Sequence, residues 1–223
     1  MYTNVNLSAP IGVMLLLGTG CLLLLLAAVA GYALIRRKSS LTKLSLSALL
    51  VVLAAYFGLM LIFSLASSDR VLARGQEKHF CEIDCHLAYS IAEARQTKTL
   101  GDGPSSMTAS GVFQLITVKT RFDEQTISSG RGNSSLEPNP RSVYLIDESG
   151  RKYFPLSNQP SSLAGTPITT PLRPGESYTT GFLFDLPAAA KNPVLVIRES
   201  DPITNFVIGH ENSLLHKLTK FQI

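Results

Sequence analysis

The stretch GVFQLITVKTRF, residues 111–122, decides the fold of the second half of this chain. It is rich in β-branched and aromatic residues, a composition typical of β-strands. From here to residue 209 short apolar runs alternate with Gly, Pro, Asn, Asp and Ser, which mark turns. The further runs that we interpret as strands are SVYLID (142–147), RKYFP (151–155), SYTTGFLFDL (177–186), NPVLVIRE (192–199) and TNFVIG (204–209).

Turn residues between these runs predict how the strands connect. Asp147–Gly150 is predicted to be a hairpin turn, and Pro174-Gly175 a tight turn before the next strand. Two stretches, 97–110 and 128–141, are predicted to be loops. About seven short strands without a helical period of apolar residues indicate an antiparallel β-sandwich.

Two long apolar stretches precede this region. Residues 11–35 and 44–66 contain no charged residue, and about 20 apolar residues suffice to cross a bilayer. The loop 36–43 between them carries four cations and no acid, whereas the tail 1–10 has neither Lys nor Arg. By the positive-inside rule the loop is cytoplasmic, so the tail and everything after residue 66 are expected outside. A cleavable signal peptide is disfavoured, because such a peptide has cations before its apolar core and a shorter apolar core than residues 11–35.

The composition supports a membrane protein. Only 16% of the 223 residues are charged, compared with about a quarter in soluble domains. The net charge of +4 is dispersed, so a concentrated face for nucleic acid is not expected. The predicted organisation is the tail, two transmembrane helices joined by the loop, a linker at 67–77 and an outer domain at 78–223. We expect it in the inner (plasma) membrane, with the lipid bilayer as one partner.

Three motifs of the outer domain carry a resemblance to a known family. They are D-x-x-G-x-x-Y at 147–153, L-x-PG-E at 172–176 and F-D-x-P at 184–187. With the strands around them they resemble the immunoglobulin-like domain of unknown function, with a fold like that of a telomere-repeat-binding factor, found outside bacterial membranes. The resemblance covers about residues 78–209. It implies an immunoglobulin-like β-sandwich and no catalytic residues.

The fourteen residues KHFCEIDCHLAYSI (78–91) hold two of the three cysteines and two of the four histidines. Strand side chains alternate between faces, and one parity here is almost wholly apolar: Cys81, Ile83, Cys85, Leu87, Tyr89 and Ile91. The stretch is therefore predicted to be one half-buried strand. A regular strand separates the Cα atoms of Cys81 and Cys85 by about 13–14 Å, whereas a disulfide needs about 7 Å or less.

Three interpretations of the cysteine pair stay open. An oxidising compartment favours a disulfide, which would require a bulge or tight turn around Glu82–Asp84. Two free, buried cysteines are the second interpretation. The third is a metal site, because thiolates together with imidazoles are ligands of copper and zinc. The candidate ligands are Cys81, Cys85, His79, His86, His210 and His216, and this site requires the tail at 210–216 to return to the same sheet edge.

A second, weaker resemblance favours copper. Cytochrome oxidase subunit II also has a two-helix anchor and an outer β-sandwich, and its binuclear copper site uses a Cys-x3-Cys pair, two histidines and a methionine. The spacing of Cys81 and Cys85 is similar, and Met107 would supply the methionine. The chain departs from that family where Tyr89 stands in place of a histidine. Cys-x3-Cys-His also resembles the haem motif Cys-x-x-Cys-His, although haem domains of that kind are helical.

Catalytic motifs are missing from the sequence: it has no Gly-x-Ser-x-Gly, no His-Glu-x-x-His and no phosphate loop. Asp123-Glu124 and Asp147-Glu148 are predicted to be solvated charges, and ENSLLHKL (211–218) a short helix packed on the sandwich. We therefore expect a non-enzymatic membrane protein whose sandwich binds a membrane or envelope protein or supports an envelope complex. The alternative is a copper-binding or electron-transfer accessory protein.

Overall fold

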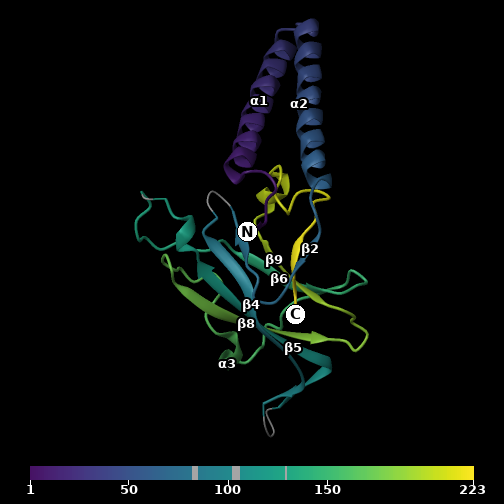
Figure 1. Ribbon diagram of the computed structural model, residues 1–223. Helices are drawn as coiled ribbons and strands as arrows, with labels where there is room; N and C mark the ends of the chain where they lie inside the picture. The colour runs from purple at the N-terminus through teal and green to yellow at the C-terminus, as the bar shows by residue number, and fades with distance from the viewer. Residues whose placement is uncertain (82–84, 102–105, 129) are drawn as a thin grey trace. The chain divides into compact units, whose positions relative to one another are not determined.

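A computed structural model describes residues 1–81, 85–101, 106–128 and 130–223 (Figure 1). These residues divide into two compact units. The first, which we call the β unit, contains residues 1–4, 68–201 and 218–223. The second, the helical unit, contains residues 5–67 and 202–217.

Two helices make up most of the helical unit: α1, Ala9–Ile35, and α2, Ser39–Leu65. Both are 27 residues long, and both are apolar and long enough to cross a membrane. Pro10 lies in the first turn of α1, where its missing N–H costs nothing. Arg37 adopts a positive φ of 52° in the short connection to α2. Most apolar side chains of the two helices are exposed.

The β unit contains two five-stranded sheets. The first has the order β1 (Tyr2–Thr3), β3 (Lys78–Phe80), β4 (Leu87–Leu100), β5 (Met107–Phe122) and β8 (Ser177–Leu186). The second has the order β2 (Arg70–Leu72), β10 (Thr219–Gln222), β9 (Val194–Glu199), β6 (Arg141–Ile146) and β7 (Lys152–Tyr153). The short elements η2 (Glu124–Thr126), α3 (Ser161–Ala164) and η3 (Pro202–Phe206) complete the description.

One apolar core joins the two sheets into a sandwich. Its fully buried members include Tyr89 and Phe184 from the first sheet and Leu145, Leu195 and Phe221 from the second. Side chains from two sheet faces that meet in one core are the defining feature of this architecture. The predicted two-helix, β-sandwich organisation is thus confirmed at the level of helices and sheets. The pairing is antiparallel except at two edges, where β1 runs parallel to β3 and β2 parallel to β10.

Several local predictions differ from the structure. The stretch 204–209, predicted to be a strand, forms η3 and turns, because its Asn and Gly residues favour local hydrogen bonds. The predicted loop 97–110 is partly strand, since β4 continues to Leu100 and β5 begins at Met107. The predicted tail helix 211–218 is also wrong: residues 211–215 form turns, and 211–217 belong to the helical unit.

Both predicted turns are confirmed. Asp147 closes the β6–β7 hairpin by accepting hydrogen bonds from the hydroxyl of Ser149 (2.6 Å) and that of Tyr153 (2.8 Å), and Gly150 has a φ of 81°. These hydroxyls, led by Ser149, lower the pKa of Asp147 to about 2. Gly175, with a φ of 80°, forms the other turn, which Glu176 N closes by donating to Arg173 O over 3.0 Å.

Candidate functional site

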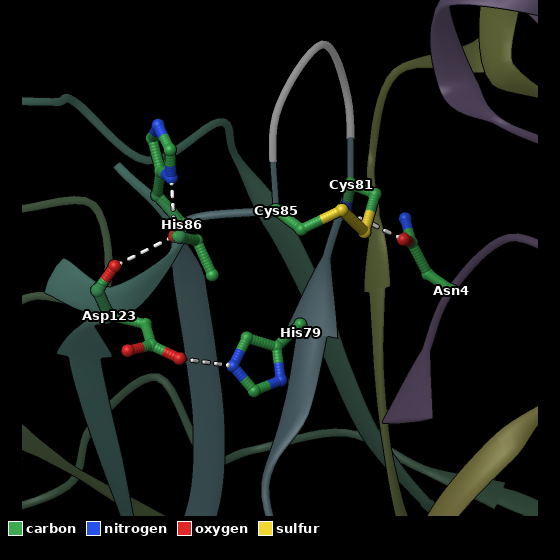
Figure 2. The surroundings of a disulfide bond; sticks show 7 residues. Asn4, His79, Cys81, Cys85, His86 and Asp123 are labelled. Carbon is green, nitrogen blue, oxygen red and sulfur yellow. Dashed lines mark hydrogen bonds and ion pairs between the residues drawn. A yellow bond between two sulfur atoms is a disulfide. The ribbon is translucent and has the colours of Figure 1, made fainter. Parts of the chain in front are cut away.

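The cysteine stretch 78–91 is a hairpin and not the single strand that we predicted. Strand β3 ends at Phe80, and β4 begins at Leu87 and pairs antiparallel with it. The reversal brings the Cα atoms of Cys81 and Cys85 to 4.1 Å, and the two sulfur atoms form a disulfide (Figure 2). The turn that we expected around Glu82–Asp84 lies outside the described residues. The disulfide interpretation of the cysteine pair is thus the one that the structure bears out.

The reversal also changes which side chains face the core. Phe80 lies opposite Leu87, which in turn lies opposite Phe122, and all three pack into the core between the sheets. On the other face the register aligns His79, Ala88 and Arg121 across three strands. Because Ala88 is small, the two long polar side chains beside it can both turn toward the end of β5. The sequence parity had assigned Phe80 to the polar face, which holds only for a strand that does not reverse.

A chain of charged side chains runs along this outer face. Arg121 donates two hydrogen bonds to the carboxylate of Glu77 (2.8 and 2.7 Å) and one to Oδ1 of Asp123 (3.1 Å). Nε2 of His79 donates to the other oxygen of Asp123, Oδ2, over 3.0 Å (Figure 2). Asp123 and His79 are both buried. Asp123 therefore links the guanidinium to the imidazole, and it is not the solvated charge that we predicted.

The carboxylates of this chain are held in their charged form. Burial by itself raises the pKa of Asp123, but the hydrogen bonds from Arg121 and His79 outweigh it and keep the pKa below its ordinary value of 3.8. The hydrogen bonds from Arg121 likewise lower the pKa of Glu77 below 4.5. In return, the hydrogen bonds to Glu77 raise the pKa of Arg121.

Further hydrogen bonds tie both ends of the hairpin to neighbouring segments. The hydroxyl of Thr126 donates to the carbonyl of Asp123 (2.7 Å), so Nδ1 of His86, 2.5 Å away, is the donor in its contact with that hydroxyl. On the opposite side Asn4 accepts from the amide of Cys81 (2.8 Å), as Figure 2 shows. Asn4 thus binds the backbone at Cys81, and Thr126 of η2 binds the side chain of His86, next to Cys85.

Two buried cations lie on the core side of the same hairpin. Lys78 is fully buried, and its Nζ donates to the carbonyls of Ile197 (2.9 Å) and Thr219 (3.2 Å) in the opposite sheet. Arg141 pairs with Glu199 at 2.8 Å. The centroid of the Phe80 ring lies 4.6 Å from Nζ of Lys78 and 4.3 Å from Cζ of Arg141. Cations over an aromatic face are stabilised by its quadrupole, so this arrangement joins the two sheets where the hairpin begins.

The six predicted metal ligands are divided between the two units. His79, His86, Cys81 and Cys85 belong to the β unit, whereas His210 and His216 belong to the helical unit. His210 accepts a hydrogen bond from the amide of Asn212 (3.0 Å), and His216 contacts the carbonyl of Lys217 (2.7 Å). Within the described ranges no three His, Cys, Asp or Glu side chains are grouped to hold a metal ion.

The copper hypothesis therefore stays a prediction, and it concerns the reduced protein. Sulfur atoms joined in a disulfide are not thiolates, which are the form that binds metal. Nδ1 of His79 is buried and has no hydrogen-bond partner among the described residues, so it could serve as a ligand. Met107 packs against an apolar cluster at the start of β5.

Sequence reasoning missed the pairing of Glu77, Arg121 and Asp123, because it depends on which strands are neighbours. One local signal was present: Asp123 follows a strand and accepts a hydrogen bond from the amide of Gln125 (3.2 Å), as an N-cap of η2. Chemically, the arrangement closes the hairpin covalently and pairs the charged side chains of its outer face with one another.

Comparisons with known proteins give similarities of structure only. No family model matches the sequence, and no curated protein matches it. Among solved structures, MPT63, a secreted protein from Mycobacterium tuberculosis, is 11% identical with a TM-score of 0.41 over 70% of this chain and 100% of that chain. The yjhA protein from Bacillus subtilis is 12% identical, with a TM-score of 0.41 over 68% of this chain and 98% of that chain. An uncharacterized β-sandwich protein from Clostridium difficile 630 is 11% identical, with a TM-score of 0.40 over 70% of this chain and 95% of that chain.

Proposed function

We propose that this chain is a two-pass protein of the bacterial inner membrane that holds an immunoglobulin-like β-sandwich on the extracytoplasmic side. The sandwich binds a protein of the membrane or envelope, or supports an envelope complex, without catalysing a reaction. In this topology α1 and α2 span the bilayer, the connection between them is cytoplasmic, and both the N-terminus and the β unit lie outside.

The pairing of β1 with β3 is the observation that carries this topology. Tyr2 and Thr3 precede both helices, yet they pair with Lys78 and His79, which follow both helices. Two segments of one sheet lie on the same side of a membrane. The chain between them must then cross an even number of times, and the two helices supply two crossings.

Two further features support the direction of the crossings. The Cys81–Cys85 disulfide favours an oxidising compartment for the β unit. The four cations of residues 36–43 favour the cytoplasm for the connection. The binding role is supported by the hairpin itself, where the thiols are joined to each other and His79 is paired with Asp123. Side chains engaged in this way stiffen the surface that the described residues of the hairpin form.

Labelling with a membrane-impermeant maleimide in intact spheroplasts tests the topology. Ser149→Cys, in the exposed β6–β7 turn, and Ser40→Cys, in the first turn of α2 at the proposed cytoplasmic surface, are each made together with Cys21→Ser. We expect the Ser149→Cys protein to react at once and the Ser40→Cys protein to react only after the membrane is permeabilised. The reverse result would overturn the proposed orientation, and immediate reaction of both would overturn the two crossings.

Photo-crosslinking in intact cells tests the binding role. A photoreactive amino acid is placed at exposed positions of the β unit, among them Phe154, Ser149 and Glu137. We expect a crosslinked product with one membrane or envelope protein from some positions and not from others, because a binding surface covers only part of the unit. A series without any specific product at any exposed position would contradict the proposal.

A further inference from the structure

The segment 202–217 of the helical unit has an inverted distribution of polar and apolar side chains. Its polar residues Thr204, His210, Glu211, Asn212 and Ser213 are buried, whereas its exposed residues include large apolar side chains. These are Ile203, Phe206, Leu214 and Leu215, each more than half exposed. Large exposed apolar side chains gathered in one region mark an interaction site.

This segment packs against one end of the helix pair. The hydroxyl of Tyr56 in α2 donates to the carbonyl of Phe206 (2.6 Å), and the amide of Lys217 donates to Oγ of Ser67 just after α2 (2.9 Å). A Cβ atom on Gly12 of α1 would lie 2.8 Å from the carbonyl oxygen of Ile208, so the two backbones approach as closely as glycine allows. The segment, yellow-green in Figure 1, is therefore held at the start of α1 and the last turns of α2.

The contacts place the segment near the boundary of the hydrocarbon layer, if the helices span as proposed above. Lys43 lies within α2 and, with the other cations of 36–43, holds this end of the helix pair at the cytoplasmic surface. Residues 44–65 then extend about 33 Å, close to the hydrocarbon thickness of about 30 Å, so Leu65 lies at the outer boundary. Tyr56 lies nine residues before Leu65, which is about 14 Å along the axis.

The polar groups of the segment are largely satisfied from within, which contact with lipid demands. Successive turns are closed by amide-to-carbonyl hydrogen bonds from Val207 to Thr204, from His210 to Val207 and from Ser213 to His210. The side-chain amide (Nδ2) of Asn212 donates to Oγ1 of Thr204 over 2.6 Å. The hydroxyl of Ser213 also donates to the carbonyl of Val207 (2.5 Å).

We propose that residues 202–217 form an interfacial membrane element, whose apolar side chains Ile203, Phe206, Leu214 and Leu215 insert among the acyl chains of the outer leaflet. This inference rests on the proposed topology and adds a third point of membrane contact to the two helices. The bilayer is the occupant of this surface because the segment belongs to the same compact unit as the spans and is level with their outer ends. A protein partner would instead require the surface to leave the lipid.

Fluorescence of single tryptophans in the full chain tests the inference, because the protein has no tryptophan of its own. Phe206→Trp and Leu214→Trp are each reconstituted in phosphatidylcholine vesicles, with and without bromine on the acyl chains. Leu24→Trp, in the middle of α1, is the control for a span, and Phe154→Trp, in the β unit, is the control for water. Two test positions are used so that the experiment can still be read if one of the substitutions prevents folding.

We expect brominated lipid to remove most of the fluorescence of the Phe206→Trp, Leu214→Trp and Leu24→Trp proteins and little of that of Phe154→Trp. Bromine near the headgroups should act most strongly on the two test positions, and bromine near the chain ends on Leu24→Trp. This inference alone would be overturned if aqueous acrylamide quenched both test positions as strongly as Phe154→Trp while brominated lipid still quenched Leu24→Trp. Failure of brominated lipid to quench Leu24→Trp would overturn the membrane topology as well.

Discussion

In the β unit Leu145, Leu195 and Phe221 are completely buried, whereas in the helical unit Leu24 and Ile35 are 73% and 82% exposed. The same contrast holds for polar side chains, since Ser64, Glu211 and Asn212 of the helical unit are buried. In the proposed topology the two units have different surroundings. Water drives apolar side chains of a sandwich inward, while an apolar environment removes that force and leaves packing and hydrogen bonding to hold the helical unit together.

The contrast would be tested most strongly by truncating one leucine in each unit. Leu195→Ala should lower the free energy of unfolding of the β unit by about 2–5 kcal/mol, because it leaves a cavity in the closed core. Leu24→Ala should change that free energy by less than about 0.5 kcal/mol. Urea unfolding of the full chain in nanodiscs, followed by near-ultraviolet circular dichroism of buried tyrosines such as Tyr89, measures both. Equal effects of the two substitutions would contradict the distinction between the units.

Acid is expected to destabilise the β unit more than the helical unit. Asp123 and Glu77 have pKa values below their ordinary 3.8 and 4.5, so the native state holds fewer protons than the unfolded state. Their contribution to stability is complete above those ordinary values and is lost as pH falls through the lower, native values. The helical unit has one acidic residue, Glu211, so we expect the β unit to unfold in acid while helical circular dichroism persists.

Replacing Asp123 measures the part of this effect due to the charged chain. Asp123→Asn should cost about 1.5–3 kcal/mol at neutral pH, the range for hydrogen bonds to charged groups, and should flatten the loss of stability with acid. Glu137→Gln removes the same charge at an exposed position and is the matched control. An unchanged acid profile in Asp123→Asn would show that other carboxylates control the transition.

Replacing the cysteines is expected to change stability by an intermediate amount, and only at the disulfide. Removing the disulfide with Cys81→Ser and Cys85→Ser should lower the stability of the β unit by about 2 kcal/mol, the loop-closure value for so short a loop. Cys21→Ser replaces the free cysteine of α1 and should leave that stability unchanged. Thermal unfolding of the three proteins, with and without reductant, gives the difference. Reductant should lower the midpoint of the unaltered protein and have no effect on the double variant.

Glycine-to-alanine substitutions are expected to give the smallest difference in stability between the two units. A Cβ atom on Gly181 would lie 1.7 Å from the carbonyl oxygen of Leu163, whereas one on Gly18 of α1 would meet no atom within 4 Å. Gly181→Ala should cost about 1 kcal/mol, the lower end of the overpacking range, because the short α3 segment can move away. Gly18→Ala should be neutral or slightly stabilising, since alanine favours a helix. Protease cleavage near α3 is expected to accelerate only in Gly181→Ala, and equal cleavage of both proteins would contradict the close approach.

Local patterns were sufficient for the parts of the molecule that depend on neighbours along the chain. The uncharged lengths of 11–35 and 44–66 predicted two helices, which the structure begins at Ala9 and Ser39. The strand at 111–122 and the turns at Gly150 and Gly175 were also predicted correctly. The immunoglobulin-like classification and the membrane topology remain proposals, and the metal site remains a prediction.

Tertiary structure alone decided the disulfide, the pairing of Asp123 with His79 and Arg121, and the role of Tyr2 and Thr3 as a strand. The parity of residues 78–91 predicted separated thiols because a periodic pattern carries no signal for a chain reversal. A strand of two residues has no pattern at all, and it forms because β3 offers unpaired backbone groups. The sequence by itself determined which segments are apolar and which are turns, while long-range pairing decided which of them meet, because such contacts join residues that are far apart along the chain.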